Sequence, residues 1–533
     1  MLQNVLGKRF QRSSILRFSS TVTPVSSRPN PSSIFALVID GYDPAYTFGE
    51  QGKKLAPTLS TLSSQYLAKA QMPTFTNVNN VSILTGTTPK THGIAGNFLY
   101  DEIQRIEIPM IQSEHIRSDS LLAKAYSIGY DIVIVTAKEK LVKLLSHQLP
   151  INVLSAADNL GDIASDNQPS VTCISLESAS IINEESSSRI VNLARSLLFQ
   201  TRSTLPTIYD PEISIAVVEL GNALVQHIQS MRQTPRPIIA FLSTTDYVQH
   251  KHSPFSIEAN HFYTLLDKAI SDLLKTHTNS TFGLTADHGM SCKYDEKSGK
   301  LNIVYVEQLL NSYNIPNRTI LPITDAHIVH HASLGGYATI HIGKCHTVNN
   351  TIKNSDTLYF EADEEWKTVQ QGQILPPGLE IKMNMNIHSG GQDNVIARKA
   401  LSTKERIEYE TTKEEMIKRA LVLLQSQVGI QRVFRKKEAA EVYSLPIDRI
   451  GDLVVVSKDN FVIGKTPTQH DLGKVDKLRS HGGESEITVP LKFNKSLNGI
   501  LDDSTMSLIA TGNASSNVLL PLLFKLKAQS DIS

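Results

Sequence analysis

Residues 34–40 read IFALVID, six apolar residues and an acid, and the turn sequence Gly-Tyr-Asp-Pro follows directly. A short continuous apolar run of this kind is typical of a strand buried on both faces of a parallel sheet. The pattern recurs in YDIVIVTAK (130–138), PIIAFLSTTD (237–246), FGLTADHG (282–289) and RIGDLVVVS (449–457). Helical patterns lie between these runs, as in EKLVKLLSHQL (139–149) and SIEANHFYTLLDKAISDLLK (256–275). The alternation predicts an α/β fold with a doubly wound, mostly parallel sheet and helices on both faces.

The composition indicates a large globular protein. The chain has 533 residues, of which 40% are hydrophobic, and it carries 52 basic and 52 acidic side chains. A length of this kind favours two lobes, and the balanced charge favours neither nucleic acid nor a membrane surface as a partner. No apolar run approaches the roughly 20 residues of a membrane helix. Cys173, Cys292 and Cys345 are too few and too far apart for a disulfide framework, which favours a reducing compartment.

The N-terminal segment differs from the rest in composition. Residues 1–33 contain Lys8, Arg9, Arg12, Arg17 and Arg28 but no acid, since the first acid is Asp40. An Arg-rich, Ser-rich, acid-free segment is typical of a mitochondrial transit peptide. We therefore expect a mitochondrial protein, with the matrix as its compartment; a disordered basic tail on a cytoplasmic protein is the alternative.

The remaining chain divides by polarity. We expect residues 34–290 and 440–530 to form the core and residues 291–439 to form a smaller α/β cap. Within that cap, residues 346–430 are highly polar and predict an insertion whose last part is one exposed helix.

Polar side chains follow three of the predicted strands. Asp40, Asp246 and the pair Asp287-His288 each stand where an apolar run ends. Ligands of open α/β sheets bind in the crevice at the carboxyl ends of the strands. These side chains are therefore candidates for a binding site.

The stretch MPTFTNVNNVSILTG (72–86) predicts the start of a helix at Thr76 or Asn77, because Val78, Val81 and Leu84 follow at helical spacing and Gly86 ends the pattern. Thr and Asn at such a place usually cap the free N–H groups of the helix. A chemical role for Thr76 is the alternative.

Further candidate ligands make a metal site plausible on chemical grounds. His250 stands four residues after Asp246, and His481 lies in the glycine-rich loop Arg-Ser-His-Gly-Gly. Taken singly, a side chain of this kind is more often a polar residue at the protein surface than a metal ligand. With Asp40, Thr76, Asp287 and His288 they supply seven oxygen and nitrogen donors, which suits two zinc ions with open positions. Two such ions are suited to phosphoryl chemistry.

The order of these motifs resembles the alkaline phosphatase superfamily and, within it, the phosphonoacetate hydrolases. The similarity lies in MPTFTNVNNVSILTG (72–86), THGIAGNFLYD (91–101), VTAKEKL (135–141), FLSTTDYVQHKHSP (241–254), TADHGM (285–290), LPITDAHIVHH (321–331) and the stretch 445–490, which runs from LPIDRIGDLVVVS to HDLGKVDKLRSHGGESEITVP. It covers most of residues 34–345 and 430–500. The resemblance implies an alkaline-phosphatase-like core and a di-zinc hydrolase. That enzyme would convert phosphonoacetate to acetate and phosphate through a phospho-threonine intermediate.

The resemblance also implies a role for each matching residue. Thr76 is the expected nucleophile, and Asn97 is expected to donate a hydrogen bond to a phosphoryl oxygen, although a simple turn role suits it too. One zinc is expected on Asp40, Thr76, Asp287 and His288, and the other on Asp246, His250 and His481. Lys138 and Lys140 are expected to face the organic part of the substrate.

The negative charge of the leaving group explains why two lysines would face the substrate. Cleaving a carbon–phosphorus bond leaves a carbanion, which in phosphonoacetate delocalises into the carboxylate and needs positive charge beside its oxygens. Lys138 and Lys140 stand two apart at a predicted helix start, where cations are unfavourable for the helix dipole. A solvated helix start is the alternative for both.

Two other functions stay open. The first is a nucleotide pyrophosphatase or phosphodiesterase acting on phosphate esters with the same metals. The second is a catalytically inactive zinc-binding relic. The expected partner is a small-molecule phosphonate, without nucleic acid or membrane, and a homodimer is one option for the assembly.

Overall fold

The computed structural model describes residues 31–47, 49–102, 106–150, 168–177, 189–295, 297–323, 332–343, 367–369, 379–384, 394–399, 403–475 and 477–530. The chain forms two compact units. Unit 1 comprises the described residues of Met1–Ile94, Ile111–Ser291 and Ser485–Ser533, and unit 2 those of Ala95–Met110 and Cys292–Glu484.

Unit 1 is built around a seven-stranded sheet with the strand order β2-β20-β8-β1-β7-β5-β6. Its strands are β1 (Ile34–Val38), β2 (Ser64–Lys69), β5 (Asp131–Thr136), β6 (Val171–Ser175), β7 (Ile238–Ser243), β8 (Thr281–Thr285) and β20 (Thr488–Phe493). The strands from β8 to β6 run parallel, whereas β20 is antiparallel to both β8 and β2. The prediction of an α/β fold with a mostly parallel sheet is confirmed.

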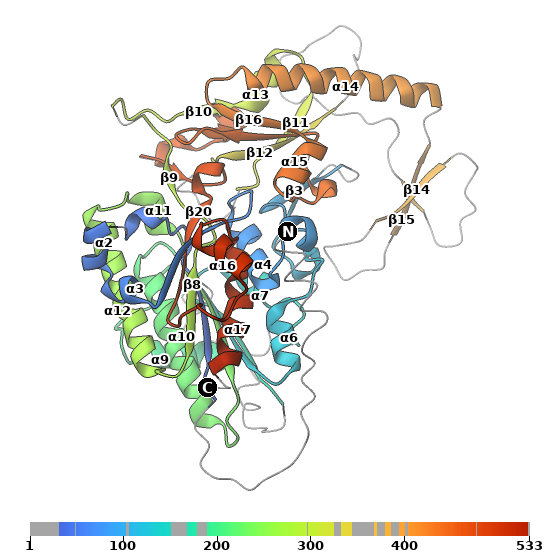
Figure 1. Ribbon diagram of the computed structural model, residues 1–533. Helices are drawn as coiled ribbons and strands as arrows, with labels where there is room; N and C mark the ends of the chain where they lie inside the picture. The colour runs from blue at the N-terminus through green and yellow to red at the C-terminus, as the bar shows by residue number, and fades with distance from the viewer. Residues whose placement is uncertain are drawn as a thin grey trace. The chain divides into compact units, whose positions relative to one another are not determined.

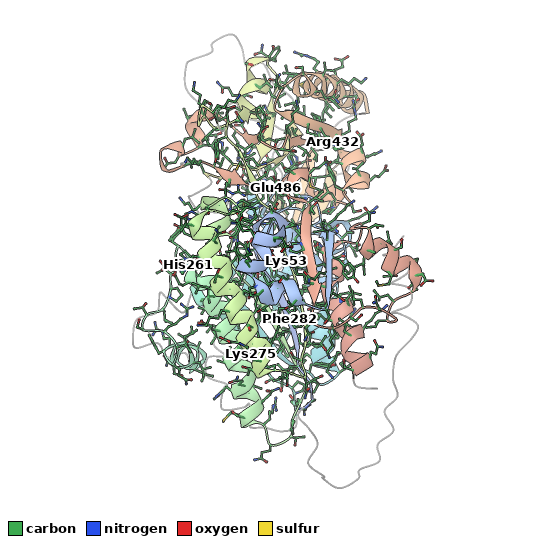
Figure 2. The ribbon with its side chains drawn as sticks, turned by 60° about the vertical axis from the view of Figure 1, so that its left-hand side comes forward. Lys53, His261, Lys275, Phe282, Arg432 and Glu486 are labelled. Atoms are coloured by element: carbon green, nitrogen blue, oxygen red, sulfur yellow. The ribbon has the colours of Figure 1, made fainter. Side chains whose placement is uncertain are left out.

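Helices cover both faces of this sheet. One face carries α9 (Arg189–Leu198), α10 (Glu212–Met231) and α12 (Ile257–Thr276), and the other carries α4 (Thr76–Thr85), α6 (Leu121–Ser127), α7 (Glu139–Leu145) and α17 (Leu519–Ser530) (Figure 1). Ser256 caps α12 by accepting a hydrogen bond from Ala259 N. Figure 2 labels His261 and Lys275 on this helix and Phe282 on β8. Because both faces are covered, every residue of β1, β5, β7 and β8 is buried, as their continuous apolar runs predict.

The register of the parallel strands gathers their carboxyl ends. Val38 at the end of β1 pairs with Ser243 of β7 on one side and with Thr285 of β8 on the other. Thr136 at the end of β5 pairs with the same Ser243. The segments that leave these four strands therefore start from one edge of the sheet.

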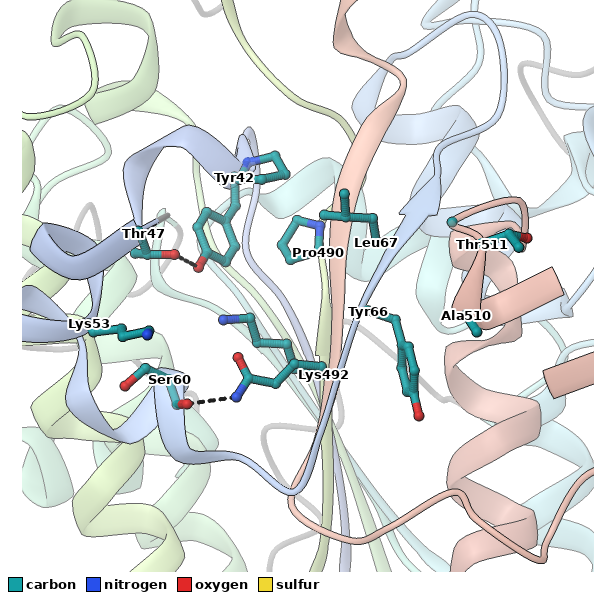
Figure 3. A pocket seen from close by; sticks show the side chains of 14 residues that line it. Tyr42, Thr47, Lys53, Ser60, Tyr66, Leu67, Pro490, Lys492, Ala510 and Thr511 are labelled. Atoms are coloured by element: carbon teal, nitrogen blue, oxygen red, sulfur yellow. Dashed lines mark hydrogen bonds between the residues drawn. The ribbon is translucent and has the colours of Figure 1, made fainter. Parts of the chain in front are cut away.

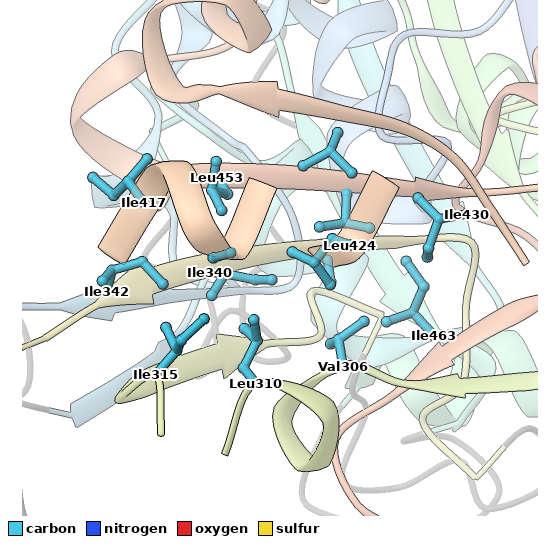
Figure 4. Packing of buried hydrophobic residues seen from close by; sticks show 14 of the residues in the cluster. Val306, Leu310, Ile315, Ile340, Ile342, Ile417, Leu424, Ile430, Leu453 and Ile463 are labelled. Carbon is cyan, nitrogen blue, oxygen red and sulfur yellow. The ribbon is translucent and has the colours of Figure 1, made fainter. Parts of the chain in front are cut away.

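Unit 2 contains a four-stranded antiparallel sheet in the order β11-β12-β17-β16. These strands are β11 (Asn317–Ile320), β12 (Tyr337–Ile342), β16 (Ile430–Arg435) and β17 (Leu453–Ser457), accompanied by helices α13 (Val306–Ser312), α14 (Thr403–Gln425) and α15 (Lys436–Val442) and by the hairpin of β3 (Phe98–Asp101) and β4 (Ile106–Pro109). Buried side chains of α13 and α14 pack on β12 and β17 in one apolar cluster (Figure 4).

The expected boundary between core and cap differs from this division. The run RIGDLVVVS forms β17, which lies in the antiparallel sheet of unit 2, so residues 440–484 belong with unit 2, as do residues 95–110. The physical reason is that β17 is a central strand between β12 and β16. It is therefore as continuously buried as a parallel strand.

The predicted polar insertion, residues 346–430, is described in part. Its described strands β13 (Lys367–Val369), β14 (Leu379–Asn384) and β15 (Asn394–Lys399) form a small antiparallel sheet. The helix expected at its end is α14, but the prediction that this helix is exposed is wrong for its C-terminal half. Met416, Ile417, Ala420 and Leu424 are buried in the apolar cluster of unit 2.

Three further features of the chain bear on the sequence predictions. Among the helices that the structure describes, none combines the length and the hydropathy of a membrane span. Cys173 and Cys292 are free thiols. Residues 1–30, nearly all of the expected transit segment, lie outside the described residues.

Candidate metal centre

Asp40, Asp287 and His288 form one group of buried side chains at the carboxyl ends of β1 and β8. His288 Nε2 lies 3.3 Å from Asp40 Oδ1 and 3.6 Å from Asp287 Oδ2. One ligand atom from each side chain lies within 4.8 Å of the others. The structure thus brings together three of the residues predicted to hold the first metal ion.

The ring of His288 is held in one tautomer. Its Nδ1 lies 2.9 Å from the carbonyl oxygen of Gly289, which can only accept, so Nδ1 carries the proton. In the neutral ring, Nε2 then presents a lone pair towards the two carboxylates. Burial lowers the pKa of His288 and so favours this neutral form. A lone pair aimed at carboxylate oxygens is favourable when a cation lies between them, and a backbone carbonyl on the other nitrogen is typical of a metal-binding histidine.

Asp287 is oriented by the backbone around it. Its Oδ1 accepts hydrogen bonds from Gly41 N at 3.1 Å and from His288 N at 3.0 Å, which leaves Oδ2 facing the histidine ring. Gly41 has a φ of 68°, and a Cβ there would lie 3.0 Å from the Cβ of Asp246. The turn after β1 therefore requires glycine in order to bring Asp40 and Asp287 together.

Asp246 and His250 form a second pair after β7. Asp246 is the N-cap of the short helix α11 (Tyr247–Lys251), and His250 follows one turn later on the same side. The distance from His250 Nε2 to Asp246 Oδ2 is 3.0 Å, and both side chains are buried. The prediction that this spacing turns both groups one way is confirmed.

Lys138 lies between the two groups. It follows β5, and its Nζ donates to Asp40 Oδ2 at 2.7 Å and to Asp246 Oδ1 at 2.8 Å, with a side chain that is only 4% exposed. Burial opposes its charge, but Asp246 and Asp40 outweigh burial and raise the pKa of Lys138. The ammonium expected to face the substrate therefore contacts the predicted metal ligands themselves. Lys140, two residues on, is partly buried in the first turn of α7.

The buried carboxylates carry more negative charge than the single ammonium of Lys138 balances. Burial first, and then the neighbouring Asp246 and Asp287, raises the pKa of Asp40 to about 8. Burial and Asp246 raise the pKa of Asp287 to about 6. Asp40 Oδ1 is buried and accepts no hydrogen bond from the part of the chain that the structure describes. Carboxylates and an imidazole held in this way fit a divalent cation of the zinc type, which would supply the missing positive charge.

Thr76 is the first residue of α4 and not its cap. Phe75 occupies the N-cap position, so the prediction that the helix begins at Thr76 is confirmed, whereas a capping role for its hydroxyl is wrong. Thr76 Oγ1 instead lies 3.4 Å from His288 Nε2, and the side chain is 4% exposed. The hydroxyl therefore adjoins the first group at the positive end of a helix dipole, which favours anions.

Asn80 is a member of this site that the sequence predictions missed. Its Nδ2 donates to Thr76 O at 3.0 Å and lies 3.4 Å from Asp287 Oδ2, and its Oδ1 accepts from Ser243 Oγ at 3.2 Å. The amide thereby connects the helix of the candidate nucleophile with the ends of β7 and β8. The signal was its spacing, because residues four apart share a helix face.

Two of the predicted site residues belong to unit 2. Asn97 is buried, its Nδ2 points to Ile323 O at 3.5 Å, and its backbone N–H donates to Pro322 O at 2.8 Å. His481 is buried in the loop after β19 (Arg479–Ser480), and its carbonyl accepts from Gly336 N at 2.8 Å. For both residues, the predicted contacts with phosphoryl oxygen or metal remain predictions.

A pocket of about 460 Å³ lies elsewhere in unit 1, beside β2 and β20 (Figure 3). Tyr42, Lys53, Tyr66 and Lys492 line it, and it includes none of the predicted site residues. The metal centre is therefore defined by its ligand groups and not by this pocket.

Comparison with known proteins agrees with the fold. A family model described as type I phosphodiesterase / nucleotide pyrophosphatase matches residues 34–484. Crystal structures of phosphonoacetate hydrolase from Sinorhizobium meliloti 1021, one with phosphonoformate and one with phosphonoacetate, match with a TM-score of 0.65 and 26% identity. These matches cover 96% of this chain and 100% of the other. Human ectonucleotide pyrophosphatase / phosphodiesterase 5 matches with a TM-score of 0.51 and 12% identity over 93% of this chain and 95% of its own, which shows the fold alone.

Proposed function

The chain belongs to the type I phosphodiesterase / nucleotide pyrophosphatase family, and we propose from this premise that it is a di-zinc phosphonoacetate hydrolase. As a member of that family it is a hydrolase, and its described residues include candidate metal-binding groups. The finer assignment concerns the bond that is cleaved: the carbon–phosphorus bond of phosphonoacetate, with acetate and phosphate as the products.

The observation that carries the proposal is the buried ammonium of Lys138, which contacts the carboxylates of Asp40 and Asp246. A phosphate diester leaves as an alkoxide or a phosphate, whereas phosphonoacetate leaves as a carbanion conjugated to a carboxylate. That leaving group requires a second centre of positive charge beside the ions. The 26% identity with an enzyme crystallised with phosphonoacetate supports the same substrate.

The residues that would hold the two ions follow from the ligand groups. Asp40, Asp287, His288 and Thr76 would hold one zinc, and Asp246 and His250, joined by His481 of the glycine-rich loop, would hold the other. When bound, the ions supply Lewis acidity, which favours ionised hydroxyl and water and neutralises phosphoryl oxygens. They would also compete with Lys138 for Asp40 and Asp246, which leaves its ammonium available to a substrate carboxylate.

Thr76 would be the nucleophile. Its Oγ1 loses a proton and bonds to phosphorus while the carbon–phosphorus bond breaks, and the electron pair of that bond passes to the departing carbon. The carbanion delocalises into its carboxylate beside Lys138 and Lys140 and takes up a proton to give acetate. Water then attacks the phosphorus of phospho-Thr76 and releases phosphate, which restores the hydroxyl. Asn97 would donate to a phosphoryl oxygen during both displacements.

A substrate panel tests the assignment. We expect phosphate release from phosphonoacetate to exceed release from phosphonoacetaldehyde and 2-aminoethylphosphonate and to exceed hydrolysis of a nitrophenyl phosphodiester. The second candidate function, hydrolysis of nucleotide esters, rests on the family as a whole. Preference for the diester would establish this second function and overturn the first.

Substitution of Thr76 tests the mechanism. Thr76→Ala should lower phosphate release by at least about a thousandfold, since triad nucleophiles removed from other hydrolases cost more than that. Zinc content is measured on the same sample, because loss of the metal would by itself lower phosphate release. A metal-loaded variant with normal turnover contradicts the phospho-threonine path. A wild-type protein that lacks two stoichiometric zinc ions would support the inactive relic.

We also propose mitochondrial localisation, on the acid-free basic composition of residues 1–33. Fusing residues 1–33 to a fluorescent protein should direct it to mitochondria. Replacing Arg9, Arg12 and Arg17 with Glu should abolish that targeting. A diffuse cytoplasmic signal from the unaltered fusion would contradict the proposal.

A further inference from the structure

Glu486 is a buried carboxylate for which the proposed mechanism has no use. It ends the short turn η7 (Glu484–Glu486), just before β20, and is 1% exposed. Its Oε1 accepts hydrogen bonds from Ser291 Oγ and Ser485 Oγ. Burying a carboxylate costs free energy unless hydrogen-bond donors satisfy it, so the presence of Glu486 in the core needs an explanation. Figure 2 labels its position.

The two ends of one short segment are bound by Glu486. Its backbone carbonyl accepts from Gly289 N at 2.8 Å, and its side chain accepts from Ser291 Oγ. The residue therefore holds the chain from position 289 to position 291 at both ends, although it lies almost 200 positions away in the sequence.

The held segment contains the atom that orients His288. The carbonyl oxygen of Gly289 accepts the proton of His288 Nδ1 at 2.9 Å, and this bond leaves Nε2 facing Asp40 and Thr76. The fit is close, because a Cβ at position 289 would lie 3.1 Å from Asp43 Oδ2 and 3.3 Å from the carbonyl oxygen of Glu486. A rotation of the 289–291 backbone would therefore turn the imidazole away from the carboxylates.

We propose that Glu486 is a positioning residue that fixes the tautomer and orientation of His288 for metal binding. Glu484, two residues earlier, has different partners. Its carboxylate accepts hydrogen bonds from Tyr443 Oη at 2.6 Å and from the side chains of Gln431 and Arg432. The inference rests on one part of the proposed function, namely that His288 binds a metal ion. Outer partners of metal ligands typically change metal affinity by about 10- to 100-fold when they are removed.

The test is a zinc titration of the metal-free full chain, with a competing chelator as the readout. Glu486→Ala should weaken the binding of one of two zinc ions by about 10- to 100-fold. Glu486→Gln keeps an oxygen that accepts from Ser291 and should retain most of the affinity. Ser291→Ala removes one end of the connection and should give an intermediate loss. It also keeps the inference testable if Glu486→Ala does not fold.

Asp267→Asn is the matched control. Asp267 is also buried in unit 1, and its carboxylate accepts hydrogen bonds from two backbone N–H groups, those of Thr58 and Leu59, neither of which is a proposed metal ligand. It should lower thermal stability and leave zinc affinity unchanged. Zinc affinity of Glu486→Ala and Ser291→Ala equal to that of wild type overturns the inference. A wild-type chain that binds no zinc overturns the proposed function instead, so the two failures are distinct.

Discussion

Replacing Asp40 with Asn should stabilise the metal-free protein while it impairs metal binding. Asp40 Oδ2 accepts from Lys138 at 2.7 Å, and an amide oxygen accepts the same bond. The amide has nearly the same shape as the carboxylate but does not bring a negative charge next to Asp246 and Asp287. The substitution therefore removes the charge repulsion and keeps the main contact.

The magnitude follows from the protonation of Asp40. Its pKa rises from an ordinary 3.8 to about 8 on folding, so the folded chain binds an extra proton in the window between those values. The free energy of unfolding of the metal-free wild type therefore falls as pH rises through this window. At about 1.4 kcal/mol per pH unit, the loss is about 4 kcal/mol at pH 7 and about 2 kcal/mol at pH 5. The Asn variant avoids this loss but buries an amide N–H₂, which costs about 2 kcal/mol, so its net gain is about 2 kcal/mol at pH 7 and near zero at pH 5.

The assay is urea unfolding of both proteins in chelator at pH 5 and pH 7, repeated with zinc. Zinc at a hundred times its dissociation constant should add about 2.7 kcal/mol to the wild type and less than about 0.7 kcal/mol to the variant, which reverses their order at pH 7. Asp267→Asn is again the control, and it should lower stability at both pH values. The reasoning is refuted if metal-free Asp40→Asn is less stable than wild type at pH 7, or if its advantage does not grow from pH 5 to pH 7.

Four further substitutions, one of them a control, test other parts of the structure. Asn80→Ala removes the amide that connects α4 to the end of β8, so steady-state kinetics at saturating zinc should show kcat/KM lowered by about 10- to 100-fold; unchanged kinetics would count against its role. Arg232→Met leaves Asp131 buried without its 2.5 Å ion pair and should cost about 3–5 kcal/mol in urea unfolding, whereas a loss below about 1 kcal/mol would contradict the assigned pairing. Leu424→Ala should destabilise unit 2 by about 2–5 kcal/mol, while Val422→Ala on the exposed face of α14 should stay within about 0.5 kcal/mol; equal effects would mean that the helix is not packed as described.

The parallel sheet could be predicted because its signal is local. The runs at 34–40, 130–138, 237–246 and 282–289 each begin with a mainly apolar stretch that ends in polar residues, and burial on both faces favours this composition for a strand. An acid at or near the end of such a run is equally local, and this is why Asp40, Asp246 and Asp287 were predicted together. Their meeting at one edge then follows from parallel register alone.

The residues that were misplaced depend on contacts that the sequence does not express locally. The run at 449–457 has the same composition as a parallel strand, and only its neighbours β12 and β16 place it in the antiparallel sheet of unit 2. The sequence of α14 is polar overall, and its buried side chains can be identified only from their packing on β12 and β17. Glu486 illustrates the same limit, because its partner Ser291 is almost 200 positions away.

The position of β20 also determines when the sheet can be completed during synthesis. β20 lies between β2 and β8, so Ser64–Lys69 enters the sheet only once Thr488–Phe493 exists, roughly 420 residues later. At about 5–20 residues per second, the ribosome needs on the order of 20–80 s to make that stretch. The early strand therefore stays without its neighbour until translation is almost finished, and Glu486 appears at the same late moment. The pairing of β2 and the hydrogen bond from Ser291 to Glu486 are therefore among the last parts of unit 1 that can form.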